Sequence, residues 1–283
     1  MEKVHEYYQF ILPLVIEAGK VMKNVVEVKT ELKNNDYGDI VTQYDRQIEE
    51  VLIRKIKDRY PTHCHIAEEE MSTKDEKPNL TDEPTWIIDP IDGTANFARG
   101  IAFTCVSVGL TINKEQVLGV VLNPYLDELF TAIKGEGAFL NGTRIFTSGC
   151  KDINTSTMNY EITIARNEKY YDLYMYRFKH LIKTVAGILA MGSAVMGLCY
   201  VACGKTDAYQ CDGLYPWDAA AGTLIVREAG GFVSDSSGEE FDLMNPNFLA
   251  TASEELCQQY LEVEGNADEE REQCLREGKE YMP

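Results

Sequence analysis

The chain has 283 residues, 45% of them hydrophobic, which is enough to bury one large core or two closely packed ones. It carries 46 acidic and 27 basic residues, and a net charge of −19 argues against nucleic acids and anionic membranes as partners. No apolar run reaches the length of a membrane span and no apolar signal core follows Met1–Lys3, so we expect a cytoplasmic protein.

The N-terminal region predicts two amphipathic helices with a strand between them. Apolar residues from Tyr8 to Met22 recur at helical spacing, and residues 26–32 alternate as a strand does. A second helical stripe runs from Tyr44 to Ile56. The eight cysteines of the chain are scattered through predicted strands and helices, which is typical of reduced, packing thiols.

Two acidic clusters follow, each after a short strand-like segment. Glu68–Glu70 come directly after His65-Ile66-Ala67, and alone they read as a solvated charge run. Asp89 follows the apolar run Trp86-Ile87-Ile88; because Pro90 cannot continue that strand, Asp89 should be held extended at its end.

Asp92 stands three residues after Asp89, before a Gly93-Thr94 turn that can open a helix. Two carboxylates, a backbone carbonyl and a helix N-terminus suit Mg²⁺ together with a phosphate. The alternative is an Asp-rich turn that only caps a helix.

Strands continue after this turn. Alternation over 106–112 predicts a half-buried strand, and 116–124 with 128–134 predict an antiparallel meander. After about residue 150 helices alternate with short strands, and the acidic residues 254–283 read as a terminal helix with a frayed tail.

A further carboxylate opens a predicted helix far along the chain. Pro216 precedes an Ala-rich segment, Asp218 falls in its first turn, and Gly230-Gly231 end it. Asp218 can be a helix cap, and capping and metal binding can coexist in one carboxylate.

Together these segments resemble the inositol monophosphatase family of Mg²⁺-dependent, lithium-sensitive phosphatases. The strings Trp-Ile-Ile-Asp-Pro-Ile-Asp-Gly-Thr-Ala-Asn-Phe at 86–97 and Trp-Asp-Ala-Ala-Ala-Gly at 217–222 are highly specific to it. The segment 134–142 matches as well, and the resemblance runs from the Asp39–Asp45 region to about Leu243. It implies an α/β fold, a layered αβαβα sandwich with an antiparallel N-terminal sheet and a mixed C-terminal sheet. We expect 1–283 to form a single catalytic unit with halves of about 1–145 and 146–283.

The resemblance implies Mg²⁺ as the cofactor and five ligands: Glu68, Asp89, the carbonyl of Ile91, Asp92 and Asp218. The three consecutive glutamates leave the first ligand open, since counting from Pro61 favours Glu68 and counting back from Asp89 favours Glu69. We expect Glu68, because an added residue in the following loop costs little.

The resemblance also implies the groups that handle water and substrate. Asp45 and Thr94 match the pair that orients and activates the attacking water. The amides of Gly93 and Thr94, with those near Gly192-Ser193-Ala194, are expected to point at the phosphate from helix starts. Asp92 and Asp218 are expected to contact the substrate as well.

One position departs from the family. Inositol-specific members carry a glutamate seven residues before the aspartate of the Trp-Asp string, where it accepts hydrogen bonds from ring hydroxyls; here that position is Cys211. A thiol is a weak hydrogen-bond partner, so the contact is lost or taken over by Asp212, unless Cys211 simply packs. Loss of one acceptor predicts activity on several inositol and sugar monophosphates.

The resemblance predicts hydrolysis of inositol monophosphates by a metal-activated water, with a small phosphomonoester as the partner and a homodimer as the assembly. The alternatives are a phosphatase for a sugar phosphate such as galactose 1-phosphate, one for a nucleotide 3′-phosphate, and an inert scaffold homologue. The presence of every metal carboxylate and of the Asp45–Thr94 pair speaks against the scaffold.

Overall fold

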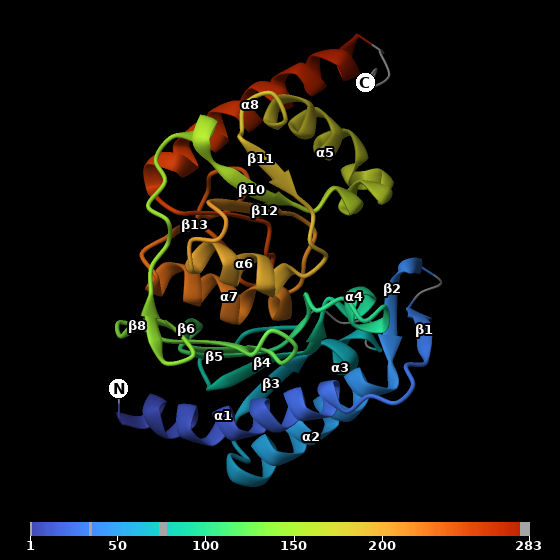
Figure 1. The fold of residues 1–283 in the computed structure, drawn as a ribbon, viewed down its shortest axis with the longest axis vertical. Helices are drawn as coiled ribbons and strands as arrows, with labels where there is room; N and C mark the ends of the chain where they lie inside the picture. Colours follow the sequence, from blue (N-terminus) through green and yellow to red (C-terminus); the bar gives the residue numbers. More distant parts are fainter. Residues whose placement is uncertain (1, 34–35, 74–77, 278–283) are drawn as a thin grey trace.

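The structure is a computed structural model that describes residues 2–33, 36–73 and 78–277. Helices and sheets alternate in five layers, with the N-terminal helices at one face and the C-terminal helix at the other (Figure 1). This confirms the predicted layered α/β fold. The helical layers are α1 (Glu2–Lys23) with α2 (Gln43–Arg59), α6 (Ala194–Ala202) with α7 (Pro216–Glu228), and α5 (Glu168–Leu181) with α8 (Glu254–Arg276).

The sheet nearest the N-terminal helices has the strand order β3-β4-β5-β6-β7-β8-β9 within the described residues. Only β3 and β4 run parallel there; every other neighbouring pair is antiparallel. The strands are β3 (Cys64–Ala67), β4 (Thr85–Asp92), β5 (Cys105–Ile112), β6 (Glu115–Asn123), β7 (Glu128–Ile133), β8 (Gly137–Leu140) and β9 (Thr143–Ile145).

The second sheet is mixed, as predicted, with the order β11-β10-β12-β14-β13 in the described part of the chain. Strand β10 is parallel to β11 and β12, while β14 is antiparallel to β12 and β13. The strands are β10 (Thr157–Tyr160), β11 (Gly187–Leu189), β12 (Ala208–Cys211), β13 (Phe232–Ser234) and β14 (Phe248–Thr251). The shorter elements are the β1 (Thr30–Lys33) and β2 (Asp36–Thr42) hairpin, α3 (Glu68–Ser72), α4 (Thr94–Ala98), and the 3₁₀ turns Ile153–Thr155 and Ile162–Arg166.

Strand β5 is buried along nearly its whole length, so the prediction of a half-buried strand was wrong. Helix α7 packs on one face of the sheet and α1 on the other, which leaves no solvent face. Gly109 on β5 allows this approach, because a Cβ there would stand 2.8 Å from the Cβ of Ala220 on α7.

Strand β4 does not stop before Pro90 but continues to Asp92, which corrects the predicted strand end. Its pairing with β5 shifts register between Asp89 and Asp92, and such an irregularity accommodates a proline that cannot donate to the ladder. The predicted strand at 26–32 is also shorter, since β1 begins at Thr30.

The position of the two middle helices explains their composition. Helices α6 and α7 lie between the two sheets and are buried on almost every side, so small and apolar residues fill them. The predicted terminal helix is α8, and the last residues of the predicted tail, 278–283, lie outside the described residues. No described helix is long and apolar enough to cross a membrane. All eight cysteines are free thiols.

Candidate active site

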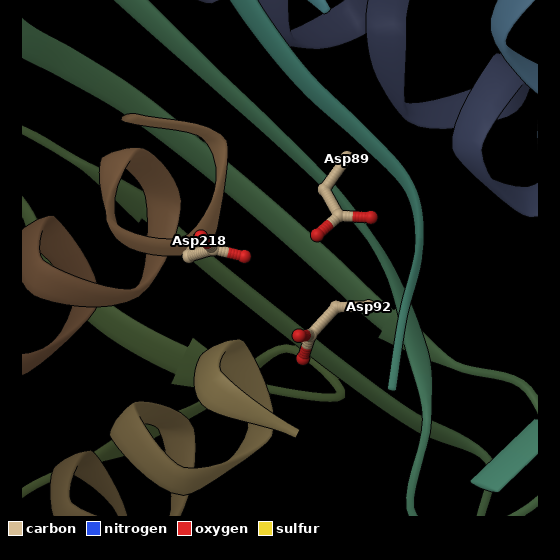
Figure 2. A group of neighbouring side chains, drawn as sticks. All are labelled: Asp89, Asp92 and Asp218. Atoms are coloured by element: carbon tan, nitrogen blue, oxygen red, sulfur yellow. The ribbon is translucent and has the colours of Figure 1, made fainter. Parts of the chain in front are cut away.

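Three aspartates converge where β4 meets the start of α7 (Figure 2). Asp89 and Asp92 come from the end of β4 and Asp218 from the first turn of α7, and one carboxylate oxygen of each lies within 4.8 Å of the others. Pro216 begins α7, and Asp218 accepts a hydrogen bond of 2.7 Å from the amide of Tyr215. The Asp218 carboxylate therefore caps the helix while facing the other two.

The negative charges of this cluster are not compensated within it. Asp89 is 2% exposed, and its Oδ1 has no hydrogen-bond partner among the described residues. Burial first, and then the charges of Glu68, Asp92 and Asp218, raise the pKa of Asp89 well above its usual range. A group of hard oxygen atoms with uncompensated negative charge fits a divalent cation such as Mg²⁺.

Glu68 is the first residue of α3 and lies outside the group of three aspartates whose oxygens are within 4.8 Å of one another. Beyond the effect of burial, its charge raises the pKa of Asp89 and of Asp218, whereas the charge of Glu69 raises that of Asp45 and Glu49. Lys33 from β1 makes ion pairs with both glutamates, at 2.7 Å to Glu68 and 2.6 Å to Glu69. The sequence carried no signal for Lys33, because only the β1–β2 hairpin brings it here.

Glu49 holds the start of α3 in place. Its Oε2 and Oε1 accept hydrogen bonds of 2.7 Å from the amides of Glu69 and Glu70, at a helix start where Ala67 offers no side-chain cap. Burial raises the pKa of Glu49 to about 7. Sequence analysis missed this residue, although Glu49 lies one helical turn after Asp45 and so shares its face of α2.

Asp45 and Thr94 are brought together as the resemblance implied. The amide and hydroxyl of Thr42 both donate to Asp45 Oδ2, the amide at 2.9 Å, while Asp45 Oδ1 lies 3.2 Å from the hydroxyl of Thr94. That hydroxyl is also 2.9 Å from the carbonyl of Ile91. Burial raises the pKa of Asp45 to about 6. One carboxylate oxygen is thus anchored, and the other faces Thr94 beside the aspartates.

Two glycine turns meet beside the aspartate cluster. Gly93 has φ 77°, and a Cβ there would lie 3.0 Å from the carbonyl of Gly192, so only glycine fits. The hydroxyl of Ser193 and the amides of Ala194 and Val195 donate to the Asp92 carboxylate, the amides at 3.1 and 2.9 Å. Asp92 therefore caps α6 as well as facing Asp89.

These bonds correct one expectation. The amides of Gly192 and Ala194 do not point at an open phosphate site, because Glu161 Oε1 accepts from Gly192 at 2.9 Å and Asp92 accepts from Ala194. Carboxylates of the chain occupy donors that the helix start offers to anions. Sequence analysis did not identify Glu161, which carries no motif.

The two residues proposed for ring recognition, Cys211 and Asp212, lie in different surroundings. Cys211 ends β12 and is 1% exposed. The Asp212 carboxylate accepts hydrogen bonds from Ser236 and from Gln210, the latter at 2.7 Å, and it lies 3.9 Å from Arg177 on α5. Since both of its oxygens already accept hydrogen bonds from side chains of the chain, the structure does not support Asp212 as the ring acceptor.

The chain is similar to known proteins along most of its length. A sequence model described as the inositol monophosphatase family matches residues 3–267. Inositol monophosphatase 2 of Solanum lycopersicum is 40% identical over 249 residues, covering 88% of this chain and 94% of the relative. Inositol monophosphatase 1 of Bos taurus is 37% identical over 256 residues, covering 89% and 92%. The solved IMPase of Thermotoga maritima superposes with a TM-score of 0.80 at 31% identity, covering 94% of this chain and 99% of that one.

Proposed function

The chain belongs to the inositol monophosphatase family, and from this we propose that it is a phosphatase that hydrolyses inositol monophosphates to inositol and phosphate with Mg²⁺. The observation that carries the proposal is the meeting of Asp89, Asp92 and Asp218 beside the Asp45–Thr94 pair. The relatives' names favour this activity over an inert scaffold or a nucleotide phosphatase.

The residues present fit the metal. We propose that Glu68, Asp89, Asp92, Asp218 and the carbonyl of Ile91 hold it. Support comes from the all-oxygen donor set and from the buried, unpartnered Oδ1 of Asp89. When bound, Mg²⁺ neutralises the ester dianion and lowers the pKa of a coordinated water.

The chain's own residues then position the water and receive its proton. The Thr94 hydroxyl is held between Ile91 and Asp45, which places it to orient a water that attacks phosphorus. The proton of that water passes to Oδ1 of Asp45, since Oδ2 is already anchored by Thr42. The ester P–O bond breaks, and the inositol oxygen leaves and takes up a proton from a solvent water.

Cys211 favours a second group of substrates. Because no glutamate stands at this position, we propose that sugar monophosphates such as galactose 1-phosphate are hydrolysed as secondary substrates.

We also propose a cytoplasmic homodimer inhibited by lithium. Li⁺ is close to Mg²⁺ in size but singly charged, so inhibition should deepen as substrate rises, because the ion traps an enzyme–phosphate complex.

The test is phosphate release from inositol, sugar and nucleotide monophosphates, each with and without Mg²⁺. We expect the highest kcat/KM with an inositol monophosphate, lower values with sugar phosphates, and no turnover without the metal. Metal-independent turnover, or a preference for a nucleotide 3′-phosphate, would contradict the proposal.

A further inference from the structure

Strands β10 and β12 are parallel neighbours, with Tyr160 opposite Gln210. The next residues, Glu161 and Cys211, therefore lie side by side at the carboxyl ends of the two strands. In open α/β sheets ligands bind outside the carboxyl ends of parallel strands. The register thus places a carboxylate next to the position where inositol-specific relatives carry one.

The carboxyl group of Glu161 is used on one side only. It is 6% exposed, and its Oε1 lies 2.9 Å from the amides of both Met191 and Gly192 and 3.4 Å from Nδ2 of Asn159. No donor among the described residues reaches its Oε2. One oxygen anchors the turn before α6, and the other is an acceptor without a donor among the described residues.

The anchored turn belongs to the active site. Asn96 of α4 donates to the carbonyls of Met191 at 2.8 Å and Gly192 at 3.3 Å, while Glu161 holds the amides of the same two residues. Ser193 follows directly and donates to Asp92. The turn is therefore fixed from both sides, and Glu161 is tied to the aspartate cluster through it.

We propose that Oε2 of Glu161 accepts a ring hydroxyl of the phosphomonoester substrate, and that Glu161 is the residue that determines specificity for polyol rings. This inference rests on the proposed function. It concerns which residue recognises the ring, and it assigns the role to β10 rather than to β12.

The neighbours of Glu161 support this role. Burial first, and then the negative charge of Glu161, raise the pKa of the Cys211 thiol well above its usual range, so the two side chains are close. A thiol is a weak hydrogen-bond partner, so Cys211 leaves the Oε2 acceptor of Glu161 available to a ligand hydroxyl. Asp212 is engaged by Ser236, Gln210 and Arg177 and does not compete.

Glu161→Gln separates anchoring from recognition. The amide oxygen of the new side chain can still accept from Met191 and Gly192, but the second oxygen becomes an NH₂ donor. We expect kcat/KM for inositol 1-phosphate to fall about 10- to 100-fold, the range for a hydrogen bond to a charged group. With p-nitrophenyl phosphate, which has no ring hydroxyl, the value should stay within about threefold. Glu262→Gln, at an exposed glutamate of α8, is the control and should change neither.

Equal losses on both substrates would show that Glu161 only anchors the turn, and unchanged values on both would remove it from recognition; either result overturns the inference. A wild-type enzyme that cleaves p-nitrophenyl phosphate but no inositol phosphate would overturn the proposed function itself, and the inference with it.

A second variant answers the question if Glu161→Gln does not fold. Cys211→Glu puts a second carboxylate beside an acceptor that already serves the ring, so we expect a lower kcat/KM for inositol 1-phosphate. A gain on inositol 1-phosphate with no change on p-nitrophenyl phosphate would show that the acceptor role at 211 is vacant, and would overturn the inference.

Discussion

The clustered carboxylates lower the stability of the metal-free protein, and Asp89 is the clearest example. Its buried Oδ1 has no partner among the described residues, and three further acidic side chains raise its pKa. Without a cation, ionising this group works against folding. The same arrangement gives the site its affinity for a metal, so stability and function oppose each other at this residue.

Asp89→Asn should therefore stabilise the metal-free protein and inactivate it. We expect the midpoint of thermal unfolding in EDTA to rise by about 2–4 °C, corresponding to about 1 kcal/mol. Turnover with Mg²⁺ should fall about 10²-fold or more. Asp82→Asn, at an exposed aspartate before the same strand, should leave both quantities unchanged. A variant that unfolds earlier in EDTA, or that keeps normal turnover, would contradict the assignment.

The raised pKa values predict how stability depends on pH. Burial raises the pKa of Asp45 to about 6 and that of Glu49 to about 7, from ordinary values of 3.8 and 4.5. Groups of this kind favour the folded state below about pH 4, and that contribution is lost as pH rises through about 6 to 7. Burial also raises the pKa of the proposed ligands Asp89 and Asp218, and because Mg²⁺ needs ionised ligands, its stabilising effect should grow as pH rises.

We expect Mg²⁺ to raise the unfolding midpoint clearly at pH 7.5 and little at pH 5. Differential scanning fluorimetry with and without the metal measures this difference directly. The same Mg²⁺ shift at both pH values would show that proton binding in the cluster is not linked to metal binding.

At the scale of elements, α2 organises two parts of the site with one face. Asp45 in its first turn meets Thr94, and Glu49 one turn later binds the start of α3, the element that carries Glu68. The ligand proposed on α3 needs such support, because this helix has five residues and buries only Glu69.

Glu49→Gln should weaken metal binding without removing a ligand. The amide oxygen of the new side chain can still accept a hydrogen bond from one of the two α3 amides. Its NH₂ group, a donor, then faces the other amide, which is also a donor. We expect the Mg²⁺ concentration for half-maximal activity to rise about 10-fold, with a smaller change in kcat at saturating metal. Glu50→Gln, at the exposed neighbour, is the matched control. An unchanged Mg²⁺ requirement would show that the hydrogen bonds from the α3 amides to Glu49 do not position Glu68.

Local pattern predicted those elements whose signals are local. The helical stripe from Tyr44 to Ile56 gave α2, and Pro216 with Gly230-Gly231 bounded α7. The burial of β5 was not predictable in this way, since its second face is covered by α7 from a distant part of the chain.

At the site, too, residues in local sequence motifs could be predicted and residues brought in by the fold could not. The aspartates of the Asp89–Asp92 turn and Asp218 could be named because they sit in recognisable strings. Lys33 and Glu161 could not, because only the fold brings them to Glu68 and to Gly192. The structure does not support Asp212 as a ring acceptor, because the side chains of Gln210 and Ser236 already donate to its carboxylate.

At the scale of the whole molecule, an ionic cluster connects α5 and α8, the outer helical layer, to the second sheet. Arg177 on α5 lies 2.8 Å from Glu264 and 2.7 Å from Asp268, both on α8, and it faces Asp212 after β12. Burial raises the pKa of Glu264 to about 8 despite the attraction of Arg177. The C-terminal helix is thereby joined to the strand that leads toward Asp218.

Arg177→Ala should destabilise the protein strongly, by about 3–5 kcal/mol, because Asp212, Glu264 and Asp268 lose the cation that they share. Urea unfolding at pH 7.5 measures the loss. Lys151→Ala, which removes an exposed ion pair with Glu255 on the same helix, should cost less than about 1 kcal/mol. Similar losses in the two variants would mean that the cluster does not hold the layer.

Both halves of the chain contribute to the cluster, with Asp89 and Asp92 from the N-terminal half and Asp218 from the C-terminal half. This supports treating residues 1–283 as one catalytic unit whose chemistry depends on a cation between the halves. The most direct test is phosphate release from inositol 1-phosphate over a Mg²⁺ titration, for wild type and Asp218→Asn. We predict saturable, Mg²⁺-dependent release by the wild type and at least about 10²-fold slower release by the variant. Equal release by both, or release that persists in EDTA, would contradict the account.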